Sequence, residues 1–349
     1  MVIQRMTHSE GAVHTGRKAT HLTNNWDKTM KIKKINLFGA LPFLALILVS
    51  LTSINAHALP GKAAAGGDSI TMGFAADCKY NYWFWDLFCL LGGDQPEHSW
   101  FDGNSSSVNS VHDRYKQLNS GIAANKNAAA SGSEMRGGSN NFATQAANIV
   151  AQTTVADHVE VALGGNDICN RDCTNPANCN NPVYTNEQWR ASVKAGLNTL
   201  VSGLPTGSTV YLAGVPRVQD LRAAGLAKQA TTYRINCNSI WSTFDICPIA
   251  TNGGTMNGES HAQRYAALEV IQRQYNEILA QEAAAYTSNS NGLNPRGIEV
   301  VSNYAGESVA STGTFRFTKD DIDGGDCFHP SVRGQNKVAD LMWNRNPDK

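Results

Sequence analysis

Short apolar runs alternate with longer amphipathic segments along most of this 349-residue chain. The runs have the length of strands and lie at 63–67, 157–164, 208–214 and 298–303. Because such alternation favours parallel strands joined by helices, it predicts an α/β fold, a three-layer sandwich with a central parallel sheet flanked by helices. In sheets of this kind, ligand chemistry takes place at the carboxyl ends of the strands.

Two segments show helical periodicity, with apolar residues every three or four positions, and each is predicted to bury one face. They contain Trp189, Val193, Leu197, Leu200 and Leu204, and then Tyr265, Leu268, Ile271, Tyr275 and Ile278. Ser331 is predicted to cap the last helix. The run at 63–67 lacks the branched residues of a central strand, so only the motif that follows it supports a strand there.

Three polar stretches contain the residue types of a serine hydrolase: Gly67-Asp68-Ser69-Ile70-Thr71, Gly164-Gly165-Asn166-Asp167 and Asp326-Cys327-Phe328-His329-Pro330. In this interpretation Ser69 attacks an acyl carbonyl and His329 takes the proton and returns it. Asp326 fixes the imidazole tautomer, and its three-residue spacing from the histidine lets one loop present both groups. The pattern predicts an ester hydrolase.

Each stretch taken alone is common in turns and loops of unrelated function, as Gly-Asp-Ser strings often are. The combination and its order carry the prediction. The nucleophile elbow of α/β-hydrolases has a glycine at the position of Thr71. This difference argues against that fold.

The four blocks together resemble the SGNH, or GDSL, hydrolase superfamily. Its glycine block is similar to Asn127-Ala128-Ala129-Ala130-Ser131-Gly132-Ser133, and its asparagine block is similar to Gly165-Asn166-Asp167. The resemblance spans about residues 63–345 and implies ester hydrolysis without a cofactor or a metal. It also implies an oxyanion hole built from the backbone N–H groups of Ser69 and Gly132 and the side-chain amide of Asn166.

The substrate class is predicted from weaker features. The strings Gly-Gly-Asn-Asp-Ile-Cys and Asp-Cys-Phe-His are similar to the phospholipase B-type branch, which implies lipid esters. Trp83, Phe84 and Trp85 lie in a dense aromatic stretch just after the nucleophile, and they are candidates for binding an acyl chain or a transient lipid interface. Packing of this stretch into the core is an equal alternative.

Two other functions remain open at this stage. Polar stretches at 102–110 and 170–181 suit a carbohydrate O-acetyl esterase. A non-catalytic binding protein on the same fold is an alternative of another class, although the intact Ser69, Asn166, Asp326 and His329 argue against it.

The N-terminal region predicts export. Lys31-Ile32-Lys33-Lys34, an apolar run over 35–51 and Ala56-His57-Ala58 form the three regions of a signal peptide, here assigned to 30–58 and cleaved near Ala58. The polar extension 1–29 precedes Met30, which suggests a mis-assigned start; if the extension is translated, the apolar run is an alternative membrane anchor. The expected product is a secreted or periplasmic domain over 59–349.

All eight cysteines lie in this domain: Cys78, Cys89, Cys169, Cys173, Cys179, Cys237, Cys247 and Cys327. In an oxidising compartment they predict disulfides, with Cys78–Cys89 and Cys237–Cys247 as attractive local bridges. Bridges among the other four would brace the asparagine block and the acid/base loop. A zinc site on Cys169, Cys173 and Cys179 is a competing hypothesis, disfavoured because paired C-x-x-C knuckles are lacking.

The charge of the chain points away from nucleic acid. The full sequence has 29 basic and 29 acidic residues. Removing residues 1–58 takes away seven basic and two acidic ones, which leaves 22 and 27. A mildly acidic domain has no electrostatic reason to bind a polyanion, so the expected partner is a small-molecule or lipid ester.

Overall fold

A computed structural model describes residues 58–78, 93–232, 235–304, 316 and 318–349. The chain from Ala56 to Lys349 forms one compact unit. The predicted extension, the signal peptide up to residue 57 and the aromatic stretch of Trp83, Phe84 and Trp85 lie outside the described residues.

The unit is built on a five-stranded sheet in which every neighbouring pair runs parallel. The strand order is β2-β1-β3-β4-β5. The bounds are β1 Ala63–Gly67, β2 Lys126–Asn127, β3 His158–Ala162, β4 Thr209–Leu212 and β5 Glu299–Ser302. The four predicted strands are therefore confirmed. The short strand β2 was not predicted, because two polar residues show no periodic pattern of apolar side chains.

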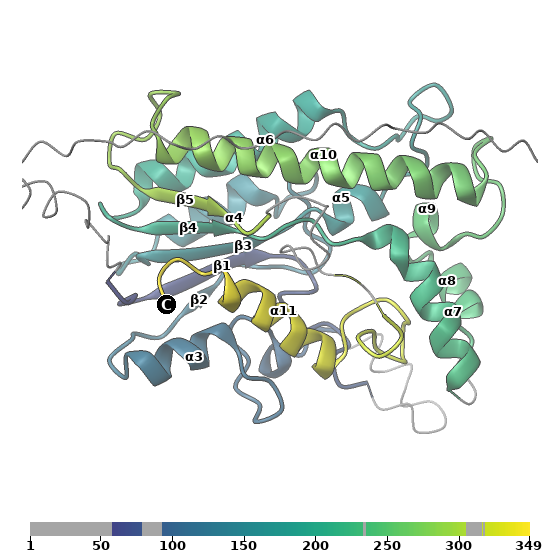
Figure 1. Ribbon diagram of the computed structural model, residues 1–349, viewed down its shortest axis with the longest axis horizontal. Coiled ribbons are helices and arrows are strands. Elements are labelled where there is room, and N and C mark those ends of the chain that lie inside the picture. The colour runs from purple at the N-terminus through teal and green to yellow at the C-terminus, as the bar shows by residue number, and fades with distance from the viewer. Residues whose placement is uncertain (1–57, 79–92, 233–234, 305–315, 317) are drawn as a thin grey trace, which may run out of the picture. The chain divides into compact units, whose positions relative to one another are not determined.

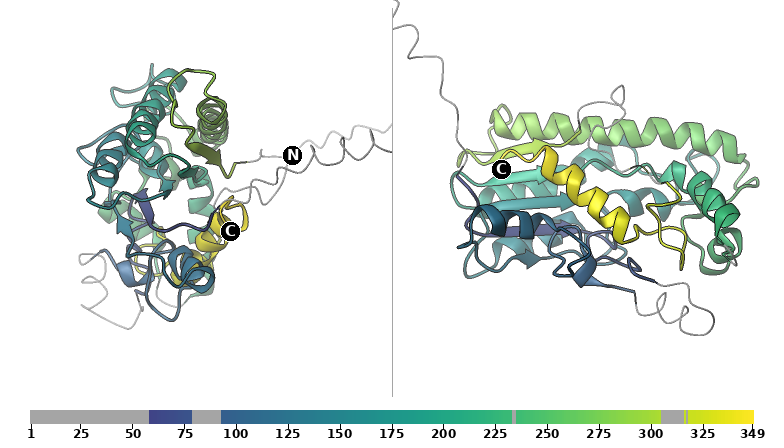
Figure 2. Two further views of the ribbon diagram at one scale, coloured as in Figure 1. Left: turned by 90° about the vertical axis from the view of Figure 1, so that its left-hand side faces the viewer. Right: turned by 60° about the horizontal axis from the view of Figure 1, so that its bottom comes forward.

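Helices cover both faces of the sheet, which confirms the predicted fold class (Figure 1). On one face lie α4 (Phe142–Val150) and α6 (Asn186–Gly203), and on the other lies α11 (Val332–Asn344), which packs on α3 (Val111–Leu118). Figure 2 shows these two layers from the strand ends. The long α10 (His261–Thr287) runs beside β5 and contacts α6.

A group of short helices lies beyond the carboxyl ends of the strands (Figure 1). It contains η2 (Val218–Asp220), α7 (Leu221–Thr231), α8 (Cys237–Phe244) and α9 (Pro248–Thr251), which pack on one another. Two further elements are η1 (Pro96–His98) and α5 (Gly165–Cys169). Within the described ranges no helix is both long and apolar enough to cross a membrane.

Strand β1 has small residues because its neighbours come unusually close. All five of its residues are buried. A Cβ on Gly67 would lie 2.0 Å from Thr71 Oγ1, and one on Gly66 would lie 2.9 Å from Gln145 Oε1. The weak strand propensity of this segment thus reflects the tight turn into Ser69 and the contact with α4, rather than a different fold.

The predicted buried face is confirmed for α6 and only in part for α10. In α6, Trp189, Val193, Leu197 and Leu200 are all buried. In α10, Tyr265 and Ile271 are only half-buried, while the polar Gln272 and Asn276 are buried. These two side chains bond the backbone O and N of Val215, at 2.7 Å each, and so hold the loop after β4.

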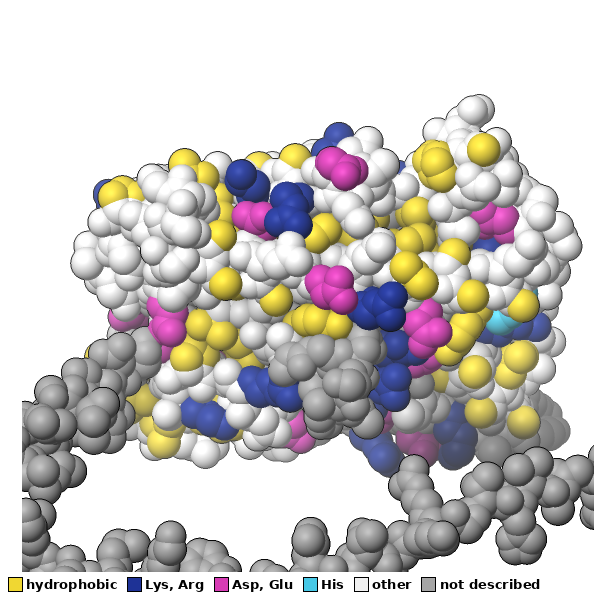
Figure 3. Space-filling view, turned by 45° about the horizontal axis from the view of Figure 1, so that its top comes forward, with side chains coloured by type: hydrophobic (Ala, Val, Ile, Leu, Met, Phe, Trp, Pro, Cys, Tyr) yellow, Lys and Arg dark blue, Asp and Glu magenta, His cyan; other side chains and the backbone are white. Residues whose placement is uncertain are grey.

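The face that Figure 3 shows has no large patch of a single charge sign. Basic, acidic and apolar side chains are interspersed there rather than gathered into one patch. Among the described residues, the large apolar side chains that are exposed come from distant parts of the chain: Leu59, Leu118, Phe244, Val270 and Leu293. Scattered single residues of this kind are normal for a folded domain and mark no binding surface.

Candidate active site

The turn after β1 presents Ser69 at the carboxyl end of the sheet. The Asp68 carboxylate accepts a hydrogen bond from Ile70 N at 2.9 Å, and Asp68 O accepts one from Met72 N at 3.0 Å. Gln335 of α11 donates to Ile70 O at 3.0 Å. These bonds fix the backbone on both sides of Ser69, a residue that is 7% exposed.

The structure brings the three candidate side chains Ser69, His329 and Asp326 into contact. His329 Nε2 lies 2.7 Å from Ser69 Oγ, and His329 Nδ1 lies 2.5 Å from Asp326 Oδ2. The second carboxylate oxygen, Asp326 Oδ1, accepts the backbone N–H groups of Phe328 and His329 at 2.8 and 2.9 Å. The three-residue spacing therefore works because the loop turns around its own carboxylate.

Two aromatic rings pack against the imidazole of His329. The ring of Phe74 is 4.5 Å from that of His329, and the ring of Phe328 is 4.7 Å away in an edge-on arrangement. Packing of this kind limits rotation of the imidazole. It keeps Nδ1 on the carboxylate and Nε2 on the hydroxyl.

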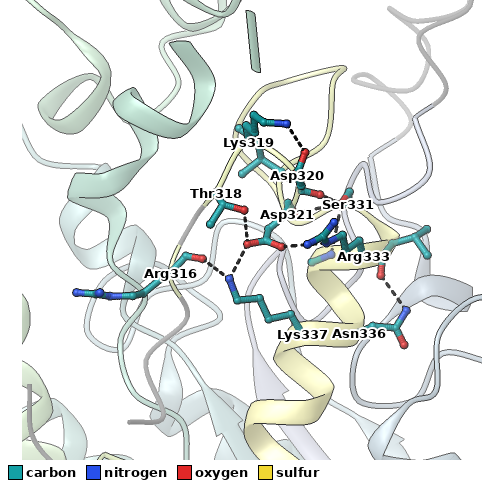
Figure 4. Close-up of polar contacts among 12 residues, drawn as sticks. Arg316, Thr318, Lys319, Asp320, Asp321, Ser331, Arg333, Asn336 and Lys337 are labelled. Atoms are coloured by element: carbon teal, nitrogen blue, oxygen red, sulfur yellow. Dashed lines mark hydrogen bonds and ion pairs between the residues drawn. The ribbon is translucent and has the colours of Figure 1, made fainter. Parts of the chain in front are cut away.

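Asp321 precedes Asp326 and His329 in the same loop and ties this loop to α11. Figure 4 shows the contacts of Asp321 with Thr318, Arg333 and Lys337. Asp321 is buried, and its Oδ2 accepts from Thr318 Oγ1 at 2.7 Å and from Lys337 Nζ at 2.5 Å. Lys337 Nζ also donates to Arg316 O at 2.8 Å. Ser331 closes the loop as the N-cap of α11, with its hydroxyl accepting from Gly334 N at 3.3 Å, as predicted.

Three groups at the site are placed as candidate oxyanion donors. Within the described residues, neither Ser69 N–H nor Gly132 N–H has a hydrogen-bond partner. Gly132 has φ +79°, and nothing lies within 4 Å of the position of a Cβ. Asn166 sits in the first turn of α5 and donates one side-chain N–H to Ser133 O at 3.0 Å, which orients the amide and leaves its second N–H.

Several carboxyl groups around the site have raised pKa values. Burial raises the pKa of Asp68 to about 6. Burial, followed by the charge of Asp326, raises the pKa of Asp323 to about 8. Burial raises the pKa of Asp167 to about 7 despite a hydrogen bond from Met135 N. The raised pKa of Asp323 favours its neutral form, which lessens charge repulsion between Asp323 and Asp326.

Among the described residues, three disulfides confirm the expected oxidation of the cysteines, but their pairing differs from the predicted one. The bonds are Cys169–Cys247, Cys173–Cys179 and Cys237–Cys327. The predicted local bridge Cys237–Cys247 is wrong, because Cys237 begins α8 beside the acid/base loop whereas Cys247 caps α9 beside α5. The other predicted bridge, Cys78–Cys89, involves Cys89, which lies outside the described residues.

The zinc hypothesis is also wrong. Cys169 is bonded to Cys247, and Cys173 is bonded to Cys179, so these thiols are not available as ligands. The part of the chain that the structure describes contains no other cluster of side chains that would hold a metal ion.

The bridges brace the two halves of the site through the short helices. Cys169 joins α5, which carries Asn166, to α9, and Cys327 joins the acid/base loop to α8. Trp241 of α8 reinforces the second link by donating its Nε1–H to Cys327 O at 3.3 Å. The sequence predicted that disulfides would brace the asparagine block and the acid/base loop directly. In the structure each of these segments is bonded instead to one of the short helices, α9 or α8.

Sequence reasoning missed the glutamines that hold the site. Gln145 of α4 accepts from Gly67 N at 2.7 Å and donates to Gly67 O at 2.8 Å. Gln335 of α11 bonds Ile70 O and accepts from Trp100 N at 3.1 Å. Both are buried polar residues on the inner face of a helix, and that position is the only signal that their sequence offers.

Comparison with known proteins identifies the family. Residues 64–342 match the family described as GDSL-like Lipase/Acylhydrolase. The chain belongs to this family. It is therefore an ester-bond hydrolase, and the SGNH/GDSL resemblance is confirmed. For this GDSL hydrolase, membership of the phospholipase B-type branch stays a prediction.

The remaining comparisons are less informative about this GDSL hydrolase. One solved crystal structure is similar over 82% of this chain and 95% of its own, with 14% sequence identity and a TM-score of 0.40. No curated protein matches the sequence.

Proposed function

We propose that this GDSL hydrolase cleaves carboxylic esters through an acyl-enzyme formed on Ser69. The observation that carries the proposal is the continuous chain of contacts from Ser69 Oγ through His329 to Asp326, at 2.7 and 2.5 Å. His329 removes the hydroxyl proton as Ser69 attacks the carbonyl, and then returns it to the leaving alcohol. Water, activated by the same histidine, releases the acid in the second half of the cycle.

The negative charge that develops on the carbonyl oxygen is stabilised by Ser69 N–H, Gly132 N–H and the free amide N–H of Asn166. The two backbone groups have no internal partner among the described residues, so they can bind an oxyanion without breaking another bond. Donors fixed in advance in this way are worth a factor of roughly 100 to 1,000 in turnover each. No step needs a cofactor.

Lipid esters are the leading substrate class. The aromatic stretch with Trp83, Phe84 and Trp85 lies outside the described residues, but its flanks are held at the site. Gly93 O accepts from Ala75 N at 2.9 Å, and Gly93 itself lies against the ring of Phe74, which packs on His329. The position of the described residue Gly93 beside Phe74 and His329 supports the proposal that the aromatic side chains of this stretch contact an acyl chain or a lipid interface.

Hydrolysis of nitrophenyl esters from acetyl to palmitoyl tests both the reaction and the substrate class. The wild type is expected to prefer medium or long chains, and Ser69→Ala is expected to abolish activity while keeping the thermal unfolding midpoint. Ser242→Ala, on the exposed side of α8, serves as the matched control and should stay fully active. A sharp acetyl preference would favour the carbohydrate O-acetyl esterase. Equal activity of Ser69→Ala and wild type would contradict the mechanism.

Export is part of the proposal. Three disulfides support folding in an oxidising compartment, secreted or periplasmic. N-terminal sequencing of the exported protein is expected to start at Leu59, and a start upstream of residue 30 would contradict cleavage.

A further inference from the structure

The two loops that supply oxyanion donors belong to different parts of the chain. Gly132 lies in an exposed turn after β2, and Asn166 opens α5. The turn that contains Gly132 is anchored to β1, because Ala130 N donates to Gly67 O at 3.2 Å, and Ser133 N closes it by donating to Ala130 O at 3.1 Å. Neither of these bonds joins the turn to α5. Both donors reach one oxygen only if the loop after Gly132 is held firmly against α5, because such sites tolerate displacements of only about 0.5 Å.

The residues that follow Gly132 bind α5 one after another. Ser133 O accepts from Asn166 Nδ2 at 3.0 Å. Met135 N and Arg136 N donate to the two carboxylate oxygens of Asp167, at 2.6 and 3.1 Å. The backbone on either side of residue 134 is therefore joined to the first turn of α5.

The side chain of Glu134 adds further bonds between the segment after Gly132 and the end of α5. It is 5% exposed, and its Oε1 accepts from Asn170 Nδ2 at 2.9 Å and from Arg171 at 2.5 Å. Its Oε2 accepts from the hydroxyl of Tyr184 at 2.9 Å. The Arg171 guanidinium in turn lies over the Tyr184 ring, 4.3 Å from its centroid. A buried carboxylate with this many donors is rigid, and it ties the glycine-block loop to the end of α5.

We propose that Glu134 is a positioning residue for the oxyanion hole: with Asn170, Arg171 and Tyr184, it fixes the loop of Gly132 against the helix of Asn166. It touches neither substrate nor the reacting atoms. The inference rests on the proposed function, because it assigns Glu134 a role in the same ester hydrolysis. Replacing Glu134 is therefore expected to weaken stabilisation of the transition state while substrate binding is retained.

Glu134→Gln and Glu134→Ala test the role. We expect kcat to fall about 10-fold in the first variant and about 100-fold in the second, with KM little changed, since a small misplacement of a donor costs up to about 100-fold. An alkyl boronic acid forms a tetrahedral adduct on serine, so its inhibition constant should rise in parallel. Rates are expressed per active site, titrated with a fluorophosphonate, so that a fraction of misfolded protein does not count.

Glu282 offers the matched control. It is 6% exposed and paired with Arg190 in a contact that joins α6 to α10, and within the described residues the side-chain hydrogen bonds of Arg190 go only to Glu282 and Gln281 of α10. Glu282→Gln should lower stability like Glu134→Gln while leaving kcat per active site unchanged. In an Asn166→Ala background the effect of Glu134→Gln should shrink, because one of the donors that it positions is gone.

The outcomes separate the two claims. If Ser69→Ala abolishes hydrolysis but both Glu134 variants keep the wild-type kcat per titrated site, the positioning role is overturned and the proposed function stands. Parallel losses in Glu282→Gln would also overturn it, because the effect would then be general destabilisation. If the wild type neither hydrolyses esters nor binds the fluorophosphonate, the proposed function fails and this inference fails with it.

Discussion

At the scale of single residues, contacts between candidate catalytic side chains were predictable where both residues belong to one short motif. Asp326 and His329 lie three positions apart in one loop, so their contact followed from spacing. The residues that hold the site's backbone in place, such as Gln145 and Glu134, were not predictable in this way. Gln145 bonds Gly67 across 78 positions of sequence, and Glu134 meets Arg171 across 37. Such partners become neighbours only through the parallel sheet, which no short pattern encodes.

The acid of the triad gives a prediction at this scale. Asp326→Asn keeps an oxygen for the backbone N–H groups of Phe328 and His329 but favours the wrong imidazole tautomer. We therefore expect kcat to fall by about 1,000 to 10,000-fold, as removal of such an aspartate does elsewhere. Asp323→Asn is the matched control, because the raised pKa of Asp323 already favours the neutral carboxyl, so this position should tolerate a neutral amide. Equal kcat losses in the two variants would contradict the assigned roles.

At the scale of elements, strands and amphipathic helices followed from apolar periodicity, and the misjudged features have physical causes. Strand β2 has only two residues and depends on β1 for its hydrogen bonds. The face of α10 was predicted from apolar spacing alone, yet buried Gln272 and Asn276 bind the backbone of Val215. The cysteine pairing failed because α8 turns its two flanking cysteines toward different neighbours.

The disulfides allow a test at this scale. Cys237–Cys327 spans 90 positions, whereas Cys173–Cys179 spans six. Replacing both cysteines of the longer bridge by alanine should destabilise the protein about 2 kcal/mol more than the same change in the shorter one, because it releases a longer loop in the unfolded chain. It should also lower kcat, since Cys327 lies between Asp326 and His329. Urea unfolding and ester hydrolysis measure the two effects; equal unfolding free energies would count against the account.

At the scale of the whole molecule, a buried polar network joins the C-terminus to the sheet. His158 of β3 is fully buried, with Nδ1 2.6 Å from Asp348 Oδ2 and Nε2 3.1 Å from Glu160 Oε1. Burial works to lower the pKa of His158, but the two carboxylates outweigh it and raise the pKa to about 9. The alternating pattern predicted β3 without indicating this network, because Asp348 is 190 positions away.

The network predicts how stability depends on pH. The folded pKa of His158, about 9, exceeds its ordinary value of 6.5, so folding favours the protonated ring. This stabilisation is complete below about pH 6.5 and is lost as the pH rises through about 9, up to about 3 kcal/mol in total. Urea unfolding across this range should show the loss in wild type and in His261→Gln. A His158→Gln variant with the same pH dependence as wild type would refute the assignment.

The central claim, that Ser69 is a nucleophile activated by His329, is tested most directly by fluorophosphonate labelling followed by peptide mass spectrometry. We expect one adduct per chain, located on Ser69 and formed in step with loss of esterase activity. In His329→Ala the labelling rate should fall by at least about 100-fold, because the general base is gone. An adduct on another residue, or full esterase activity in protein labelled completely at Ser69, would contradict the account.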